Sequence, residues 1–137
     1  MTDTIDAGFA WQVVPQGEKD NWGEHKGKDL SGRGYKSLRL WSKMEPGSAP
    51  RARIEFKSGG NVDAKFATTN RPSYLVSTGL VPVDSDWKEF CLDLSHLDLR
   101  NVVSPFTVVI SAAFNPPTRI GVYIDGVNYS QQPCTKK

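Results

Sequence analysis

The stretch Asp86–Val102, DWKEFCLDLSHLDLRNV, indicates the fold of this chain. Every second side chain from Phe90 to Leu94 is apolar and those between are polar or small, which is the pattern of a β-strand with one buried face. Trp87 stands at the entrance of this strand, and a leucine-rich segment, Leu97–Leu99, follows its exit. The stretch therefore predicts a half-buried strand that runs into a tight turn.

The same alternation recurs along the chain in short runs, which are separated by clusters of Gly, Pro, Asn and Ser that favour turns. Helical periodicity is nearly absent. We therefore predict an all-β fold, a two-sheet antiparallel β-sandwich of the jelly-roll type with about eight strands. The candidate strands are residues 8–14, 35–43, 51–59, 63–68, 73–81, 87–94, 106–114 and 119–130.

Alternation within these strands assigns each side chain to the inner or the outer face of a sheet. The positions expected to point inward and form the core are Leu38, Leu40, Ile54, Phe56, Phe90, Leu92, Leu94, Phe106, Val108, Ile110, Ile120, Val122 and Ile124. The opposite parity places on the outer face Arg39, Trp41, Arg53, Glu55, Lys57, Glu89, Cys91, Asp93, Val109, Ser111, Tyr123 and Asp125. Such a mixture of aromatic and charged side chains suits a polyhydroxylated ligand.

Size and charge narrow the class of protein. A chain of 137 residues fits a single domain, 1–137, and the polar ends 1–8 and 131–137 are expected to be flexible. The net charge is +2, with the basic residues scattered along the chain, which argues against a nucleic-acid partner. No apolar run could span a membrane, and the opening MTDTIDAGF lacks the features of a secretory signal. Localisation therefore stays open: the protein is extracytoplasmic if the chain is a fragment of a longer secreted protein whose leader lies outside it, and cytoplasmic otherwise.

The cysteines and histidines form no recognisable metal or catalytic motif. Cys91 and Cys134 could pair, but a thiol in the centre of a strand is more often a small buried hydrophobe, which favours unpaired cysteines. His25 and His96 have no companion ligand at metal-binding spacing, and GxSxG, P-loop and HExxH motifs are absent from the sequence. We therefore expect neither a cofactor nor catalysis.

Several stretches resemble a known family. With the opening stretch, the segments NWGEHKGKDLSG, KSLRLWSK, RARIEFK and RIGVYIDGVNYS are similar to the galactose-binding-like β-sandwiches that serve as carbohydrate-binding modules beside bacterial glycoside hydrolases. They are more distantly similar to the domain of the mitochondrial complex I assembly factor. The similarity runs from Phe9 to Tyr129. It implies a non-catalytic binding module in which Trp87 and the leucines of Leu97–Leu99 are structural.

The chain departs from that family at its last strand. The family pattern is Y-x-D-D-(I/V)-x-Y, whereas this chain has Gly126 at the position of the second Asp. Family members also carry strands ahead of the Phe9 position that help to hold a structural calcium ion, and only eight residues precede Phe9 here. Because calcium requires several oxygen ligands, we expect no metal site.

The sequence predicts a ligand site on the outer face. Tryptophans can stack on the apolar faces of sugar rings, and the polar neighbours can bind hydroxyl groups. The predicted ligand-binding residues are Trp11, Gln12, Trp22, Arg39, Trp41 and Glu55. The alternative is that the tryptophans pack at the edge of the core and the charged residues form a solvated sheet face.

Two kinds of partner follow from this pattern. The first is a polysaccharide or oligosaccharide, and the second is a protein, including another copy of the chain. A homodimer through the sheet edge at Phe9–Val14 is expected, because that segment is apolar on both parities and carries no Lys, Arg or Pro. In the alternative arrangement, residues 15–34 fold back over this edge with Trp22 as a plug.

Overall fold

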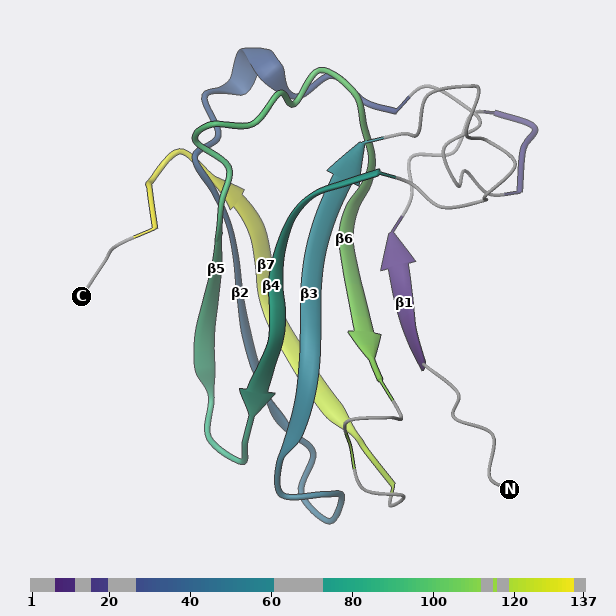
Figure 1. Ribbon diagram of the computed structural model, residues 1–137, viewed down its shortest axis with the longest axis vertical. Helices are drawn as coiled ribbons and strands as arrows, with labels where there is room; N and C mark the ends of the chain where they lie inside the picture. The colour runs from purple at the N-terminus through teal and green to yellow at the C-terminus, as the bar shows by residue number, and fades with distance from the viewer. Residues whose placement is uncertain are drawn as a thin grey trace.

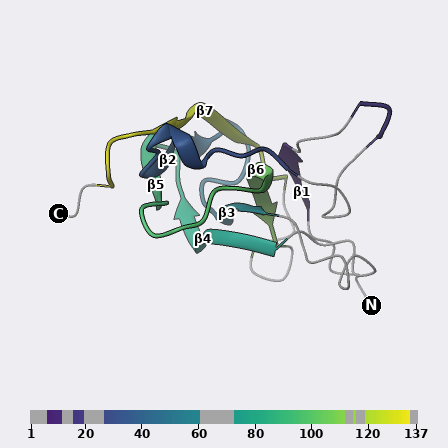
Figure 2. The same ribbon diagram turned by 90° about the horizontal axis from the view of Figure 1, so that it is seen from above.

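The chain folds as two antiparallel β-sheets packed face to face (Figures 1 and 2). The computed structural model describes residues 7–11, 16–19, 27–60, 73–111, 115 and 119–134. Its elements are β1 (Ala7–Trp11), a short 3-10 helix η1 (Ser31–Arg33), β2 (Ser37–Met44), β3 (Ala52–Gly60), β4 (Ser73–Val83), β5 (Lys88–Asp93), β6 (Val102–Ile110) and β7 (Val122–Ser130). One sheet has the order β1-β6-β3-β4 and the other has the order β5-β2-β7.

This architecture confirms the prediction of an all-β, two-sheet sandwich. The described residues form seven strands where the sequence predicted about eight. The predicted strand 63–68 lies outside the described residues. No helix in the described parts of the chain is long and apolar enough to cross a bilayer.

The core between the sheets confirms the predicted parity. Every side chain predicted to point inward belongs to one apolar cluster, either buried or packed against its buried members. Leu38 and Leu40 of one sheet and Ile54 and Phe56 of the other are fully shielded from solvent. The period-two pattern alone therefore identified the buried face of each strand, because successive side chains of a strand point to opposite sides of its sheet.

Strand β6 begins earlier than predicted, at Val102 rather than at residue 106. The predicted strand begins at Phe106, directly after Pro105, a residue that cannot donate a backbone hydrogen bond to a sheet. In the structure Pro105 lies where the register between β3 and β6 shifts, between the pairs Lys57↔Thr107 and Gly59↔Ser104. A bulge leaves one residue unpaired, so the missing donor of Pro105 costs no ladder bond.

Tyr129 connects the two sheets across the core. Its hydroxyl group donates to the carbonyl of Pro105 (2.7 Å) and lies 2.9 Å from the hydroxyl of Ser58. Burial raises the pKa of the Tyr129 hydroxyl. The last strand, β7, is therefore attached to β6 and β3 of the opposite sheet by polar contacts as well as by packing.

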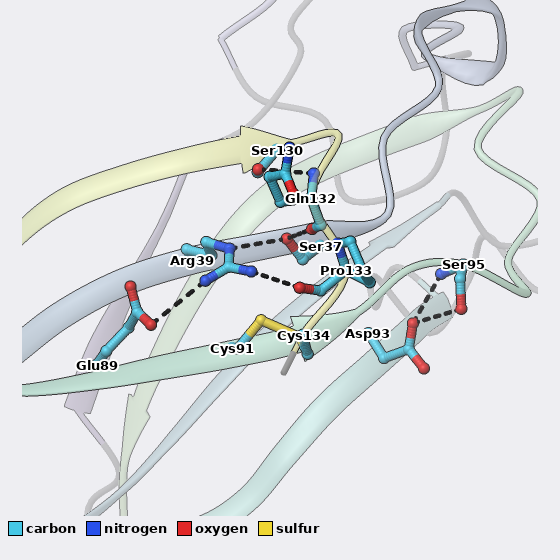
Figure 3. Close-up of a disulfide and its surroundings, with 10 residues drawn as sticks. All are labelled: Ser37, Arg39, Glu89, Cys91, Asp93, Ser95, Ser130, Gln132, Pro133 and Cys134. Carbon is cyan, nitrogen blue, oxygen red and sulfur yellow. Dashed lines mark hydrogen bonds and ion pairs between the residues drawn. A yellow bond between two sulfur atoms is a disulfide. The ribbon is translucent and has the colours of Figure 1, made fainter. Parts of the chain in front are cut away.

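The two cysteines form a disulfide, which corrects the expectation of unpaired thiols. Cys91 in β5 and Cys134 are joined, with their Cα atoms 5.9 Å apart (Figure 3). Cys91 points to the outer side of its sheet, as its parity predicts, and the chain after β7 turns back across that side and reaches it. The polar sequence of residues 131–137 predicts a flexible end, whereas residues 131–134 are held against the sheet by this bond.

Candidate functional site

Three half-exposed aromatic side chains gather on the outer side of the β5-β2-β7 sheet. Trp41, Trp87 and Tyr123 each expose 44% of their surface. We call this surface the aromatic face. Single exposed apolar side chains are common, but several grouped on one surface mark a binding site more often, so the aromatic face is the leading candidate for a binding site.

Strand register brings these residues together. Trp41 in β2 lies opposite Glu89 in β5 and opposite Asp125 in β7. One step along the strands, Lys43 of β2 lies opposite Tyr123. Trp87 immediately precedes β5, whose first residue is paired with Ser42, and this pairing places Trp87 on the other side of Lys43. The face thus contains two neighbouring rows, Trp87-Lys43-Tyr123 and Glu89-Trp41-Asp125.

The ammonium group of Lys43 lies between two aromatic rings. Its Nζ atom is 5.1 Å from the centre of the Trp87 ring and 5.8 Å from the centre of the Tyr123 ring. Both distances are within the range of cation–π attraction. Lys43 is therefore in cation–π contact with both rings of the aromatic face that lie beside it.

Gly126 shapes the β7 side of the aromatic face. Its φ angle is +63°, a conformation that favours glycine, and the register between β2 and β7 shifts beside it, between Arg39 and Trp41. A Cβ atom at this position would lie 3.5 Å from Cδ1 of Trp41. Gly126 thus permits this backbone turn and keeps the side of the Trp41 indole uncovered.

Arg39 lies next to the aromatic face but is engaged in holding the C-terminal segment. Its guanidinium donates to the hydroxyl of Ser37 (3.1 Å), to the carboxylate of Glu89 (3.4 Å) and to the carbonyl of Pro133 (Figure 3). The hydroxyl of Ser37 in turn donates to the carbonyl of Gln132 (2.6 Å). With the disulfide, these contacts fasten residues 131–134 over one end of the sheet. Arg39 thus makes structural contacts, and its predicted role in ligand binding stays a prediction.

The structure separates the other predicted site residues. Trp11 ends β1 in the four-stranded sheet, is 51% exposed, and stacks on the core residue Phe106 with a ring-centre distance of 5.2 Å. Glu55 lies on the outer side of the same sheet, where its carboxylate forms an ion pair with the ammonium group of Lys57 (3.7 Å between Oε1 and Nζ). Of the predicted residues that the structure describes, only Arg39 and Trp41 share a face. Gln12 and Trp22 lie outside the described residues.

Sequence reasoning missed Trp87 as a surface residue. The resemblance assigned it to packing, but its ring is exposed on the aromatic face. The signal was present: extending the outward parity of Glu89 back by two positions leads to Trp87. Tyr123 and Asp125 were assigned outward without being grouped with Trp41, because the pairing of β2 with β7 joins segments about 80 residues apart, which alternation cannot reveal.

A hollow is lined by residues of η1 and of the β5–β6 connection, two segments that lie at the same end of the sandwich (Figure 1). It has a volume of about 390 Å³, and Asp98 and Arg100 are among the residues that line it. Hydrogen bonds from Arg100 lower the pKa of Asp98 to about 2, so the two charges satisfy each other. Its aromatic residue, Tyr35, packs on Tyr129 with a ring-centre distance of 5.3 Å. The charged and aromatic groups of this hollow are therefore already engaged within the chain, and the aromatic face is the better candidate for a ligand site.

Within the described residues, no group of three or more His, Cys, Asp or Glu side chains is arranged to hold a metal ion. The expectation of a metal-free protein stays a prediction. No protein-family description, curated protein or solved structure matches this chain. The resemblance to carbohydrate-binding modules therefore depends on the sequence motifs alone, and function has to be inferred from the geometry of the aromatic face.

Proposed function

We propose that this protein is a non-catalytic carbohydrate-binding module with a jelly-roll fold, and that it holds a glycan on the aromatic face. The observation that carries the proposal is the grouping of Trp41, Trp87 and Tyr123 on one sheet surface, each half-exposed. Pyranose rings have apolar C–H faces, which aromatic planes remove from water. The resemblance of the sequence to galactose-binding-like modules supports the same conclusion independently.

The arrangement favours an extended glycan over a single sugar. Trp87 and Tyr123 are each diagonal neighbours of Trp41 across a strand pair. The Cα atoms of such neighbours lie roughly 7 to 8 Å apart. This separation exceeds the width of one pyranose ring. A ligand that stacks on Trp41 and on a second ring therefore needs more than one sugar unit.

The first prediction concerns Trp41. We expect Trp41→Ala to weaken binding to a retained polysaccharide by about 5- to 30-fold, because loss of one stacking ring removes on the order of 1 to 2 kcal/mol. Affinity electrophoresis against a panel of plant and bacterial polysaccharides measures the change. Trp11→Ala is the matched control, since Trp11 is similarly exposed but lies in the other sheet. Circular dichroism of both variants checks that they fold.

Two results would count against the proposal. Retardation of the parent protein by no polysaccharide in the panel would remove its basis. If Trp11→Ala abolished retardation while Trp41→Ala did not, the glycan would bind at the edge of the four-stranded sheet and the aromatic face would have another role.

A second candidate function is association between copies of the chain. We propose a homodimer through the edge formed by β1, and what supports it is the position of β1 in the sheet. Among the described strands β1 pairs only with β6, so it forms the edge of the four-stranded sheet. Edge strands offer backbone groups to a second chain, and two-fold association is the commonest form of self-assembly.

Sedimentation equilibrium at micromolar concentration tests the dimer. We expect a concentration-dependent mass that approaches twice the chain mass of 15.2 kDa. A proline in the edge strand, Ala10→Pro, should shift the equilibrium to monomer by removing a backbone donor. A single species of 15.2 kDa at every concentration would instead favour the arrangement in which residues 15–34 cover the edge.

A further inference from the structure

The positive charges of the aromatic face are already engaged within it. The guanidinium of Arg39 donates to Ser37, Glu89 and Pro133. The ammonium of Lys43 lies over the rings of Trp87 and Tyr123. A uronate or sulfate group on a glycan would therefore compete with the existing acceptors of Arg39.

The negative charges are arranged differently. The carboxylates of Glu89 and Asp125 stand on the two strands that flank Trp41. The carboxylate of Glu89 forms a long ion pair with the guanidinium of Arg39, with 3.4 Å between the nearest nitrogen and oxygen atoms. Asp125 is exposed and accepts the backbone N–H of Gly126 (2.8 Å), and no ion pair in the described part of the chain involves it. Two carboxylates and two cations, Arg39 and Lys43, therefore surround Trp41, and of these four groups Asp125 alone has neither an ion pair nor a cation–π contact in the described part of the chain.

An indole ring flanked by carboxylates favours an ammonium group. The ring attracts a cation to its face through its quadrupole, and carboxylates nearby add charge attraction. The protein contains an internal example one row away, where the Lys43 ammonium lies over two aromatic rings. In the neighbouring row the aromatic ring is at the centre: Trp41 lies between the carboxylates Glu89 and Asp125.

We infer that the glycan held on the aromatic face is an amino-sugar polymer with free, protonated amino groups, of the β-linked glucosamine class. One ammonium group lies over Trp41 between Glu89 and Asp125, and the adjoining sugar stacks on Trp87 or Tyr123. This inference rests on the proposed carbohydrate-binding function and specifies its ligand class. The net charge of the whole chain is +2, so a preference for a cationic glycan would have to originate locally rather than from overall attraction.

The test compares three oligosaccharides of equal length and β-1,4 linkage by calorimetry, using the full chain with its disulfide intact. They are a glucosamine oligomer, its N-acetylated counterpart and a glucuronate oligomer, at a mildly acidic pH that protonates the amine. We expect the glucosamine oligomer to bind about tenfold more tightly than the N-acetylated one, with the glucuronate oligomer weakest. The preference should decrease between ~0.01 M and ~0.15 M salt, because the charges are exposed.

Asp125→Asn preserves the size of the side chain and removes its charge. This variant should bring the ratio of the affinities for the glucosamine oligomer and the N-acetylated oligomer toward one. Asp93→Asn is the matched control, because Asp93 stands in the same sheet beyond Cys91, at the end covered by residues 131–134. The control variant should keep the ratio of the parent protein. Equal effects of the two variants would show general charge attraction and would overturn the assignment to Trp41.

The remaining outcomes separate this inference from the function it rests on. Equal binding of the glucosamine and N-acetylated oligomers, or tighter binding of the N-acetylated or glucuronate oligomer, would overturn the ligand class and leave a carbohydrate-binding module. Failure of the protein to bind any of these oligomers or any polysaccharide of the wider panel would overturn both.

Discussion

Replacement of Phe56 by alanine should lower the free energy of unfolding by about 3 to 5 kcal/mol, because it removes buried apolar surface and leaves a cavity. Phe56 is fully shielded from solvent. Its ring lies 6.0 Å from Phe106 of the same sheet and 5.1 Å from Phe90 of the opposite sheet. The ring thus connects the two layers at the centre of the core, where neighbouring side chains have little freedom to close the gap.

Urea denaturation followed by tryptophan fluorescence measures this effect. Lys57→Ala is the control, because Lys57 is the next residue of β3 and points to the other side of the sheet. Its ion pair with Glu55 is partly exposed, and such pairs contribute at most about 1 kcal/mol. A larger loss for Lys57→Ala than for Phe56→Ala would mean that the parity of β3 is displaced by one residue.

Reduction of the Cys91–Cys134 disulfide should lower the free energy of unfolding by about 4 kcal/mol in the chain-entropy treatment. The size follows from the length of the closed loop, since the two cysteines are 43 residues apart in sequence. The bond restricts the unfolded chain by joining β5 to the segment that follows the last strand. Its loss also releases residues 131–134, whose contacts with Ser37 and Arg39 are hydrogen bonds to backbone carbonyls.

Urea denaturation with and without a reductant tests the disulfide. The double variant Cys91→Ser, Cys134→Ser should unfold like the reduced parent protein and should not respond to the reductant. Identical unfolding of the oxidised and reduced parent protein would show that the bond does not contribute to stability.

Which side of each strand is buried was determined by the sequence itself. Leu38, Leu40, Ile54 and Phe56 were assigned to the core from alternation, and all are fully shielded in the structure. The assignment succeeds because the two-residue period is a local property of an extended backbone and needs no knowledge of neighbouring strands. The same reasoning assigned Trp41, Cys91 and Tyr123 to the outside, where the structure places them.

Which outward residues become neighbours was decided only by the tertiary structure. Alternation is identical in both sheets, so the sequence could not reveal that Trp11 lies in one sheet and Trp41 in the other. Trp87 and Tyr123 are brought beside Trp41 by pairing between segments far apart in the chain. The disulfide required the same information, since its formation depends on where the chain after β7 turns back over β5. Inward or outward orientation is encoded within a few residues, whereas strand order and register arise from the packing of the whole chain.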